Sequence, residues 1–475
     1  MCRYDGRELG HSSPPLIPTP VPVAPHAVAA REDTLARRLS PRQVSMIALG
    51  GAVGTGFFLG SGVSVRLAGP GVILAYALGG FIALVIAWSL AEMAVVHPVA
   101  GSFGVYAEIY LHPWAGFTMR YSYWVGVNIA VGSEVVAVAI YCHFWFPHVP
   151  GWLWVGIFSL SLLAANAWTV ASFGEFEFWL ALIKVVTIVT FILVGVALLF
   201  GFGPFPARGL GNYTGQGGFL PNGWRGVLLA TSLATFSYFG VEEVAVAAGE
   251  ARDPAHSIPR AMRSVFWRLG LFYIGGITVL VGLVPWPVAG LDASPFVRAF
   301  QAVGVGAAPT LMNLVVLTAA LSSANALLYL SARMIFSLAR GGYAPEALGY
   351  TTSRGIPIWA LAASGVGMGL AVLAETYIPG RAYLALVGTS MFAGLYVWIM
   401  ILLTHLRFRR VHRNDASAHF MPASPLLNVV ALAGLFWVTL STWFVPGLRI
   451  TLMAGVPWLV SISLAYGVWH TKNRA

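Results

Sequence analysis

Four ionisable residues interrupt apolar runs of this sequence, where a charged side chain could do chemical work. They are Glu134, Lys184, Glu242 and Glu243. Ionisable groups inside apolar segments are costly to bury and mark functional sites by default. Burial disfavours the charged form of a carboxyl group, so such a group can take up a proton near neutral pH. The chemistry that these residues indicate is the binding and release of protons.

Lys184 is unusual because the chain otherwise relies on arginine. The sequence holds 27 Lys and Arg residues, and only Lys184 and Lys472 are lysines. Lys184 lies about eight residues into its apolar run, which is a depth of roughly 12 Å at 1.5 Å per helical residue. A lysine there is a compact charge that can also lose its proton. The alternative is a lysine that reaches the headgroups or is tolerated by packing.

The glutamates have structural interpretations as well. Glu134 and Glu242 could be hydrogen-bonding carboxyl groups between helices. Glu242 and Glu243 are adjacent and point about 100° apart on a helix, so both cannot share one environment. Glu243 is either a misfit relieved by a neighbouring helix or a second titrating group. Glu250 fits a salt bridge in a loop.

A glycine-rich run occupies the first apolar segment, at residues 48–62. Glycine lowers helix stability by about 1 kcal/mol relative to alanine, so the run predicts a break in the helix. Unwound backbone at membrane depth survives only where it lines a cavity or meets a ligand. A second candidate break lies at residues 238–240. The alternative for the glycines is close packing between helices.

The elements that position these residues are membrane-spanning helices. Of the 475 residues, 58% are hydrophobic and 9% are charged, whereas a soluble domain carries about 25% charged residues. The mean hydropathy is +0.78. Apolar windows of about 20 residues predict about twelve spans. The predicted spans are 43–65, 70–95, 117–143, 151–169, 177–201, 225–248, 265–286, 308–332, 357–376, 383–405, 426–446 and 450–470.

The basic residues orient this bundle. With the N-terminus inside, the inner segments hold 20 Lys and Arg residues and the outer loops hold 6. This bias predicts that both termini are cytoplasmic in a multi-pass protein of the inner or plasma membrane. The net charge of +10 therefore reflects topology and does not indicate nucleic-acid binding. Cys2 and Cys142 fall on opposite sides of the membrane, so no disulfide is expected.

The chain divides into four parts. We expect a disordered cytoplasmic tail (1–34), a core of ten transmembrane helices (35–408), a cytoplasmic loop (409–425), and two further helices with a short tail (426–475). Residues 1–30 are rich in proline, and a misassigned start codon would also explain them.

Several motifs resemble those of one known family. They are the run 48–62, FGEFEFW at 173–179, FSYFGVE at 236–242, AGEARDP at 248–254, SIPRA at 257–261 and LSSAN at 321–325. In this order they resemble amino acid permeases of the amino acid–polyamine–organocation superfamily, and most of all the bacterial amino acid transporter branch. The resemblance covers about residues 35–360.

The resemblance implies a fold and a set of site residues. The fold is an all-α integral membrane protein of about twelve helices, with a five-plus-five inverted repeat, broken helices 1 and 6 and two extra C-terminal helices. The substrate carboxylate would meet Gly54, Thr55 and Gly56, and the amino group would meet carbonyls near Ala52 and residues 236–239. The implied substrate-binding set is Ala52, Gly54, Thr55, Gly56, Phe236, Phe239 and Gly240. The implied coupling set is Lys184, Glu242, Glu134, Ser322 and Ser323.

Two further expectations concern single residues. Lys184 would take the place of a sodium ion near Ser322 and Ser323, which favours proton coupling, and Phe236 would close over the substrate. Asn128 is less typical of the family, and we expect it to reach the pocket for the substrate side chain.

The resulting hypothesis is an importer of amino acids that is coupled to protons and works by alternating access. An exchanger with the same site, or a membrane sensor that binds without pumping, remains open. A membrane enzyme is disfavoured, because the histidines are scattered and no spacing suggests metal ligation. We expect no metal or other cofactor and no nucleic-acid partner. The amino acid carried and the oligomeric state are left open.

Overall fold

All regular structure in the described part of the chain is helical. The computed structural model describes residues 54–97, 99, 102–168, 173–202, 207–242, 269–290, 292–303, 306–352, 355–413 and 421–472. No strand occurs among them, so the predicted all-α class is confirmed. The predicted tail (1–34) lies outside these residues, and the four-part division of the chain stays a prediction.

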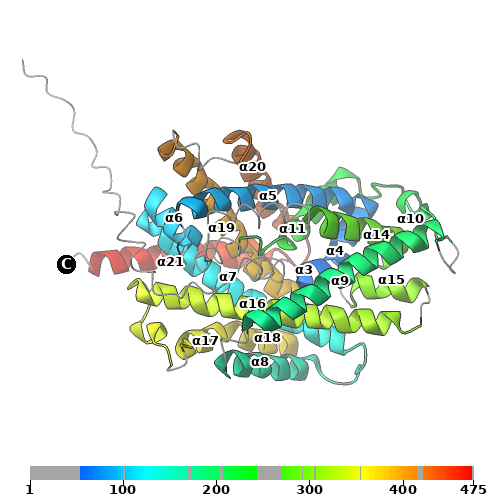
Figure 1. Cartoon of the computed structure of the whole chain (residues 1–475), viewed down its shortest axis with the longest axis horizontal. Helices are drawn as coiled ribbons and strands as arrows, with labels where there is room; N and C mark the ends of the chain where they lie inside the picture. The colour runs from blue at the N-terminus through cyan, green and yellow to red at the C-terminus, as the bar shows by residue number, and fades with distance from the viewer. Residues whose placement is uncertain are drawn as a thin grey trace, which may run out of the picture.

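The described chain consists largely of long helices, most of which run lengthwise in the view of Figure 1. They are α5 (Val72–Val96), α7 (Pro113–Cys142), α8 (Gly151–Trp168), α9 (Phe173–Phe200), α16 (Ala308–Arg340), α19 (Ala382–Val411), α20 (Leu426–Ser441) and α21 (Ile450–Lys472). The shorter helices are α3 (Thr55–Phe58), α4 (Ser61–Ala68), α6 (Ser102–Tyr110), α10 (Gly211–Thr214), α11 (Gly223–Phe236), α14 (Gly276–Leu283), α15 (Pro295–Val303), α17 (Ile358–Ser364) and α18 (Val366–Tyr377). A π-helical turn, η2 (Leu269–Gly275), leads into α14.

The helices have the length and composition of membrane spans. Among the described residues, eight segments are long and apolar enough to cross a membrane, and two shorter apolar helices are Gly151–Ala167 and Gly270–Leu283. Each of the twelve predicted spans overlaps at least one helix. Large apolar side chains such as Leu193 and Leu464 face outward, as expected of a surface that meets lipid.

Some helices extend beyond their predicted spans. The helix α16 has 33 residues and ends at Arg340, whereas its predicted span ends at residue 332. A hydropathy window stops at the first arginines, but a helix satisfies its own backbone and continues past the apolar region. The short helices α6 and α15 were not predicted, because neither is long enough to give a membrane signal.

In the first and sixth predicted spans, a described helix begins or ends at the position of the predicted break. The helix α3 begins at Thr55 after an extended Gly54, and α11 ends at Phe236 before turns at residues 237–242. Gly240 has φ +106, a conformation that favours glycine. A Cβ added to Gly56 would lie 3.0 Å from the Phe236 ring, so the two breaks lie side by side.

The helix α7 lies at the centre of the bundle and is mostly buried. It packs against α16, α18 and α19. Close contact with α18 requires a small residue, since a Cβ added to Gly132 would lie 2.5 Å from the Gly367 carbonyl oxygen. One face of α7 is thereby presented to the two breaks, and this arrangement forms the candidate site.

Candidate functional site

A cavity lies where the two breaks meet α7, α16 and α19. One face of α7 lines it at helical spacing with Tyr123, Gly126, Val127, Ala130 and Glu134. The remaining lining residues come from the first break (Gly54, Gly56), the second break (Phe236, Ser237, Phe239, Gly240, Glu242), α16 (Leu327) and α19 (Ser390, Ala393, Gly394). The lining is mainly apolar or small, and its charged members among these residues are Glu134 and Glu242.

The first break holds a carboxylate of the protein itself. The Thr55 amide donates to both oxygens of Glu134, at 3.2 Å to Oε1 and 3.3 Å to Oε2. A Cβ added to Gly54 would lie 2.7 Å from Glu134 Oε1, so a side chain at residue 54 would collide with this carboxylate. The amide predicted to bind a substrate carboxylate is therefore already paired with Glu134.

Lys184 lies close to the same break but does not line the cavity. Its side chain is buried, and Nζ donates to Ser323 Oγ at 3.1 Å. A Cβ added to Gly54 would lie 3.1 Å from that oxygen, which places Ser323 between Lys184 and the break. The Lys184 ammonium lies near enough to attract the Glu134 carboxylate electrostatically. Ser322 is also buried, on α16.

Tyrosine hydroxyls complete the surroundings of the breaks. The Tyr383 hydroxyl donates to Thr55 Oγ1 at 3.3 Å. At the second break, the hydroxyls of Tyr76 and Ser237 share a hydrogen bond of 3.1 Å. Both tyrosines are buried, so each hydroxyl needs such a partner.

The second break is organised around Glu242. Its Oε2 accepts hydrogen bonds from the Gly240 amide at 3.0 Å and from Trp398 Nε1 at 3.1 Å. Phe239 lies between its neighbours, with ring centroids 5.6 Å from Phe236 and 4.8 Å from Trp398. Phe236, the ring predicted to close over a substrate, therefore lines the cavity together with Phe239, and Glu242 lies beside them.

Most of the predicted site residues are brought together, and the exceptions are specific. Ala52, Glu243 and Glu250 lie outside the described residues. The expectation for Asn128 is wrong, because its side chain is used between helices. Its Nδ2 donates to the Ala363 carbonyl at 3.0 Å, and its Oδ1 accepts from the Gly367 amide at 2.6 Å. Asn128 therefore joins α7 to α17 and α18 and does not enter the cavity.

Three residues at or near the site were not found from the sequence. They are Tyr123, Tyr383 and Trp398, whose side chains carry no charge and therefore do not stand out within or beside apolar runs. A buried indole N–H needs an acceptor, so Trp398 could have been marked as the partner of a buried carboxylate. Nothing in the sequence indicates which carboxylate that is. Among the described residues, no group of three or more His, Cys, Asp or Glu is placed to hold a metal ion.

Comparison with known proteins places the chain among transporters. The family described as amino acid permease matches residues 43–474. The chain is similar to the uncharacterized amino acid permease YtnA of Bacillus subtilis, with 38% identity over 453 residues that cover 94% of this chain and 98% of the relative.

Two further relatives have names that state their substrates. The chain is similar to the aromatic amino acid transport protein AroP of Escherichia coli strain K12, with 39% identity over 91% of this chain and 95% of the relative. It is also similar to the probable threonine/serine transporter YbxG of Bacillus subtilis, with 38% identity over 93% of this chain and 96% of the relative.

Proposed function

The chain belongs to the amino acid permease family, and on that premise we propose that it imports neutral amino acids together with protons by alternating access. Transport of amino acids across a membrane follows from the family and from its relatives. The coupling to protons, the direction of transport, the plasma membrane location and the substrate class are our proposals. The observation that carries the proposed coupling to protons is the hydrogen bond between Glu134 and the Thr55 amide.

This hydrogen bond supports an obligatory link between substrate and proton. An unwound backbone amide is the group that would bind the carboxylate of an amino acid. Two ionised carboxylates that share one site repel each other strongly, and one of them takes a proton. The substrate carboxylate therefore gains access to the Thr55 amide when Glu134 is protonated and withdraws its oxygens. Substrate and proton then enter together and leave together.

Lys184 supplies a fixed positive charge close to the site of this exchange. Its ammonium is held by Ser323 behind the first break and does not line the cavity. It attracts the Glu134 carboxylate, and it would attract a substrate carboxylate in the same place. A permanent positive charge there would attract the carboxylates as a bound sodium ion could, so we propose that transport needs no sodium.

The second break would close the site. Phe236 and Phe239 line the cavity with Glu242 beside them. Glu242 is held by the Gly240 amide and by Trp398, so a proton on Glu242 would weaken its acceptor role and loosen the turn. Glu242 would thus make the closing of the break depend on protonation.

The lining favours substrates with a neutral side chain. Beyond the breaks the cavity meets Val127, Ala130, Leu327 and Ala393, which offer no charge to pair with a charged side chain. An unpaired charge there would lose its hydration without compensation. We therefore propose apolar or small neutral amino acids as substrates, a class that includes the aromatic amino acids named for AroP and the threonine and serine named for YbxG.

The experiment is uptake of labelled amino acids into proteoliposomes that carry an imposed pH gradient. We expect accumulation above the external concentration when the outside is acidic, without sodium, and competition by neutral but not by cationic or anionic amino acids. We expect Lys184→Ala and Glu242→Gln to lose accumulation while the purified variants remain folded, because Lys184 supplies the positive charge near the first break and Glu242 makes the closing of the second break depend on protonation.

Three outcomes would contradict the proposal. Accumulation that requires sodium and ignores the pH gradient would remove proton coupling. Uptake that occurs only into vesicles preloaded with an amino acid would show an exchanger. Binding without any uptake would show a sensor.

A further inference from the structure

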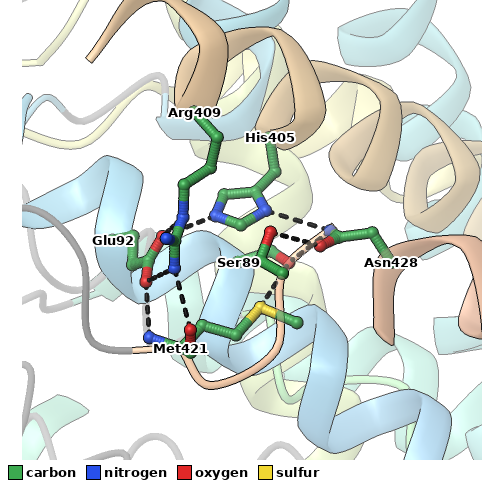
Figure 2. Close-up of polar contacts among 7 residues, drawn as sticks. Ser89, Glu92, His405, Arg409, Met421 and Asn428 are labelled. Carbon is green, nitrogen blue, oxygen red and sulfur yellow. Dashed lines mark hydrogen bonds and ion pairs between the residues drawn. The ribbon is translucent and has the colours of Figure 1, made fainter. Parts of the chain in front are cut away.

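A second buried polar cluster lies apart from the cavity, where α5, α19 and the segment leading into α20 meet (Figure 2). Its centre is the Glu92 carboxylate on α5, which is 0% exposed. Glu92 Oε2 accepts from His405 Nε2 and Arg409 Nε, each at 2.7 Å. Glu92 Oε1 accepts from Arg409 Nη2 and from the Met421 amide, each at 2.5 Å.

The cluster continues through His405 to Asn428 on α20. His405 Nδ1 lies 3.0 Å from Asn428 Nδ2, and Asn428 Nδ2 also donates to Ser89 Oγ at 3.3 Å. Asn428 Oδ1 accepts from Ser424 Oγ at 3.0 Å, which leaves the amide nitrogen facing the imidazole. His405 Nδ1 is then an acceptor, and Nε2 carries the hydrogen donated to Glu92. In this arrangement His405 is neutral, and Glu92 and Arg409 balance each other.

This composition indicates a fixed joint between helices. The Arg409 guanidinium donates two hydrogen bonds to the Glu92 carboxylate, one to each oxygen. This bidentate geometry fixes the relative orientation of the two side chains in addition to attracting them. Arg409 also donates to the Met421 carbonyl at 2.9 Å. Removing one partner of a buried ion pair leaves an uncompensated charge, whereas replacing the whole pair by neutral groups is often tolerated. The cluster therefore fixes both the position of α19 along its axis and its rotation about that axis, relative to α5.

The same face of α19 reaches the candidate site. His405 and Arg409 follow Trp398 by about two and three helical turns, and α19 is continuous over this length. Trp398 Nε1 donates to Glu242, and the Trp398 ring packs on Phe239. A helix is stiff along its axis, so the position of its end at Glu92 sets the position of Trp398 at the second break.

We propose that Glu92 is a positioning residue for transport: with His405 and Arg409 it fixes α19 against α5 and so holds Trp398 on Glu242 and Phe239. This inference rests on the proposed role of the second break in closing over the substrate. Glu92 itself neither lines the cavity nor meets the substrate. Its effect on substrate affinity passes through Trp398.

The test compares single and paired variants in proteoliposomes, with rates normalised to folded carrier. We expect Arg409→Met to raise the KM for amino acid uptake about tenfold, because the unpaired Glu92 charge displaces α19. The double variant Glu92→Gln/Arg409→Met removes both charges and is expected to return the KM to within about twofold of the wild type. Arg409→Lys, which keeps the charge without the bidentate geometry, is expected to lie between them.

A second arm tests whether the effect passes through Trp398. We expect Trp398→Phe to raise the KM, and Arg409→Met added to it to change the KM little further, since both act on one contact. Arg410→Met serves as the matched control, because Arg410 is exposed on the same helix and should leave the KM unchanged.

Several results would overturn the inference. An unchanged KM in folded Arg409→Met, or effects of Arg409→Met and Trp398→Phe that multiply, would leave the cluster without a positioning role. Loss of accumulation driven by the pH gradient in Glu92→Gln/Arg409→Met would make Glu92 a proton carrier instead. If Glu242→Gln accumulates normally, the proposed function fails at the second break, while the KM comparison still reports on Glu92 and Trp398.

Discussion

At the scale of single residues, the central feature is that Glu134 occupies an amide expected to serve the substrate. The contact joins residues 79 positions apart, and it places a titratable group on the binding backbone itself. A carboxylate that must yield to another carboxylate senses both the proton and the substrate. This differs from a glutamate that only conducts protons, because its effect depends on the negative charge of the ligand.

That difference gives a prediction for Glu134→Gln. In the wild type, the affinity for an amino acid should fall as the pH rises, and substrate binding should take up a proton from weakly buffered solution. In Glu134→Gln, the dependence on pH should weaken and proton uptake should disappear, because the amide side chain carries no charge to neutralise. Calorimetry in buffers of different ionisation enthalpy measures both quantities.

The control for this prediction is a ligand without the carboxylate. The amine obtained by decarboxylation of the same amino acid should bind weakly and with little dependence on pH in the wild type, because it does not compete with Glu134 for the Thr55 amide. Proton uptake by Glu134→Gln equal to that of the wild type would exclude Glu134 as the site.

At the scale of elements, α7 connects the cavity to the rest of the bundle. Its cavity face carries five residues between positions 123 and 134, among them Tyr123 and Glu134. Asn128 and Gly132, which lie between these two, face α18. The positions are interleaved along one helix, so a displacement of α7 from α18 would also displace Glu134 from Thr55. Close approach at Gly132 therefore contributes to the site as well as to stability.

The prediction at this scale is a pair of glycine substitutions. We expect Gly132→Ala to destabilise the protein by about 1–3 kcal/mol, since the added methyl group would overlap the Gly367 carbonyl. Gly156→Ala on α8 is the control. A Cβ there meets no atom within 4 Å, and alanine favours the helix by up to about 1 kcal/mol. Thermal unfolding in detergent distinguishes them, and equal effects would contradict the packing argument.

At the scale of the whole molecule, the excess of arginine in alternate loops predicts its orientation in the membrane. The predicted outer segments include Asp292, whose side chain is 72% exposed, and the predicted inner segments include the exposed Arg410. Asp292 lies in a bend before α15, Arg410 lies in the last turn of α19, and neither residue lines the cavity. They therefore report on the two faces of the bundle without disturbing the site.

The corresponding prediction uses cysteine labelling in intact cells, with Cys2 and Cys142 replaced by serine. A maleimide that cannot cross the membrane should label Asp292→Cys at once and Arg410→Cys only after permeabilisation. Loss of the exposed Asp292–Arg298 pair should have little effect on stability, about 0–1 kcal/mol. The reverse pattern of labelling would invert the proposed topology.

The sequence determined the membrane class, the spans, the positions of the two breaks and three of the buried charges, which are Glu134, Lys184 and Glu242. These follow from local composition, because an apolar run must be buried in lipid or protein and a glycine run weakens a helix wherever it lies. Glu92 was missed because it lies close to the end of its predicted span (70–95), where a charge costs little in a hydropathy window.

Only the tertiary structure decided which groups meet. Glu134 meets Thr55, Glu242 meets Trp398, and Glu92 meets Arg409, across 79, 156 and 317 residues of sequence. Such pairing depends on how each helix is rotated about its axis and how far it is shifted along it. A rotation of one residue, about 100°, exchanges a cavity face for a packing face. Asn128 shows the consequence: its type suited the pocket, and the rotation of α7 assigned it to α18.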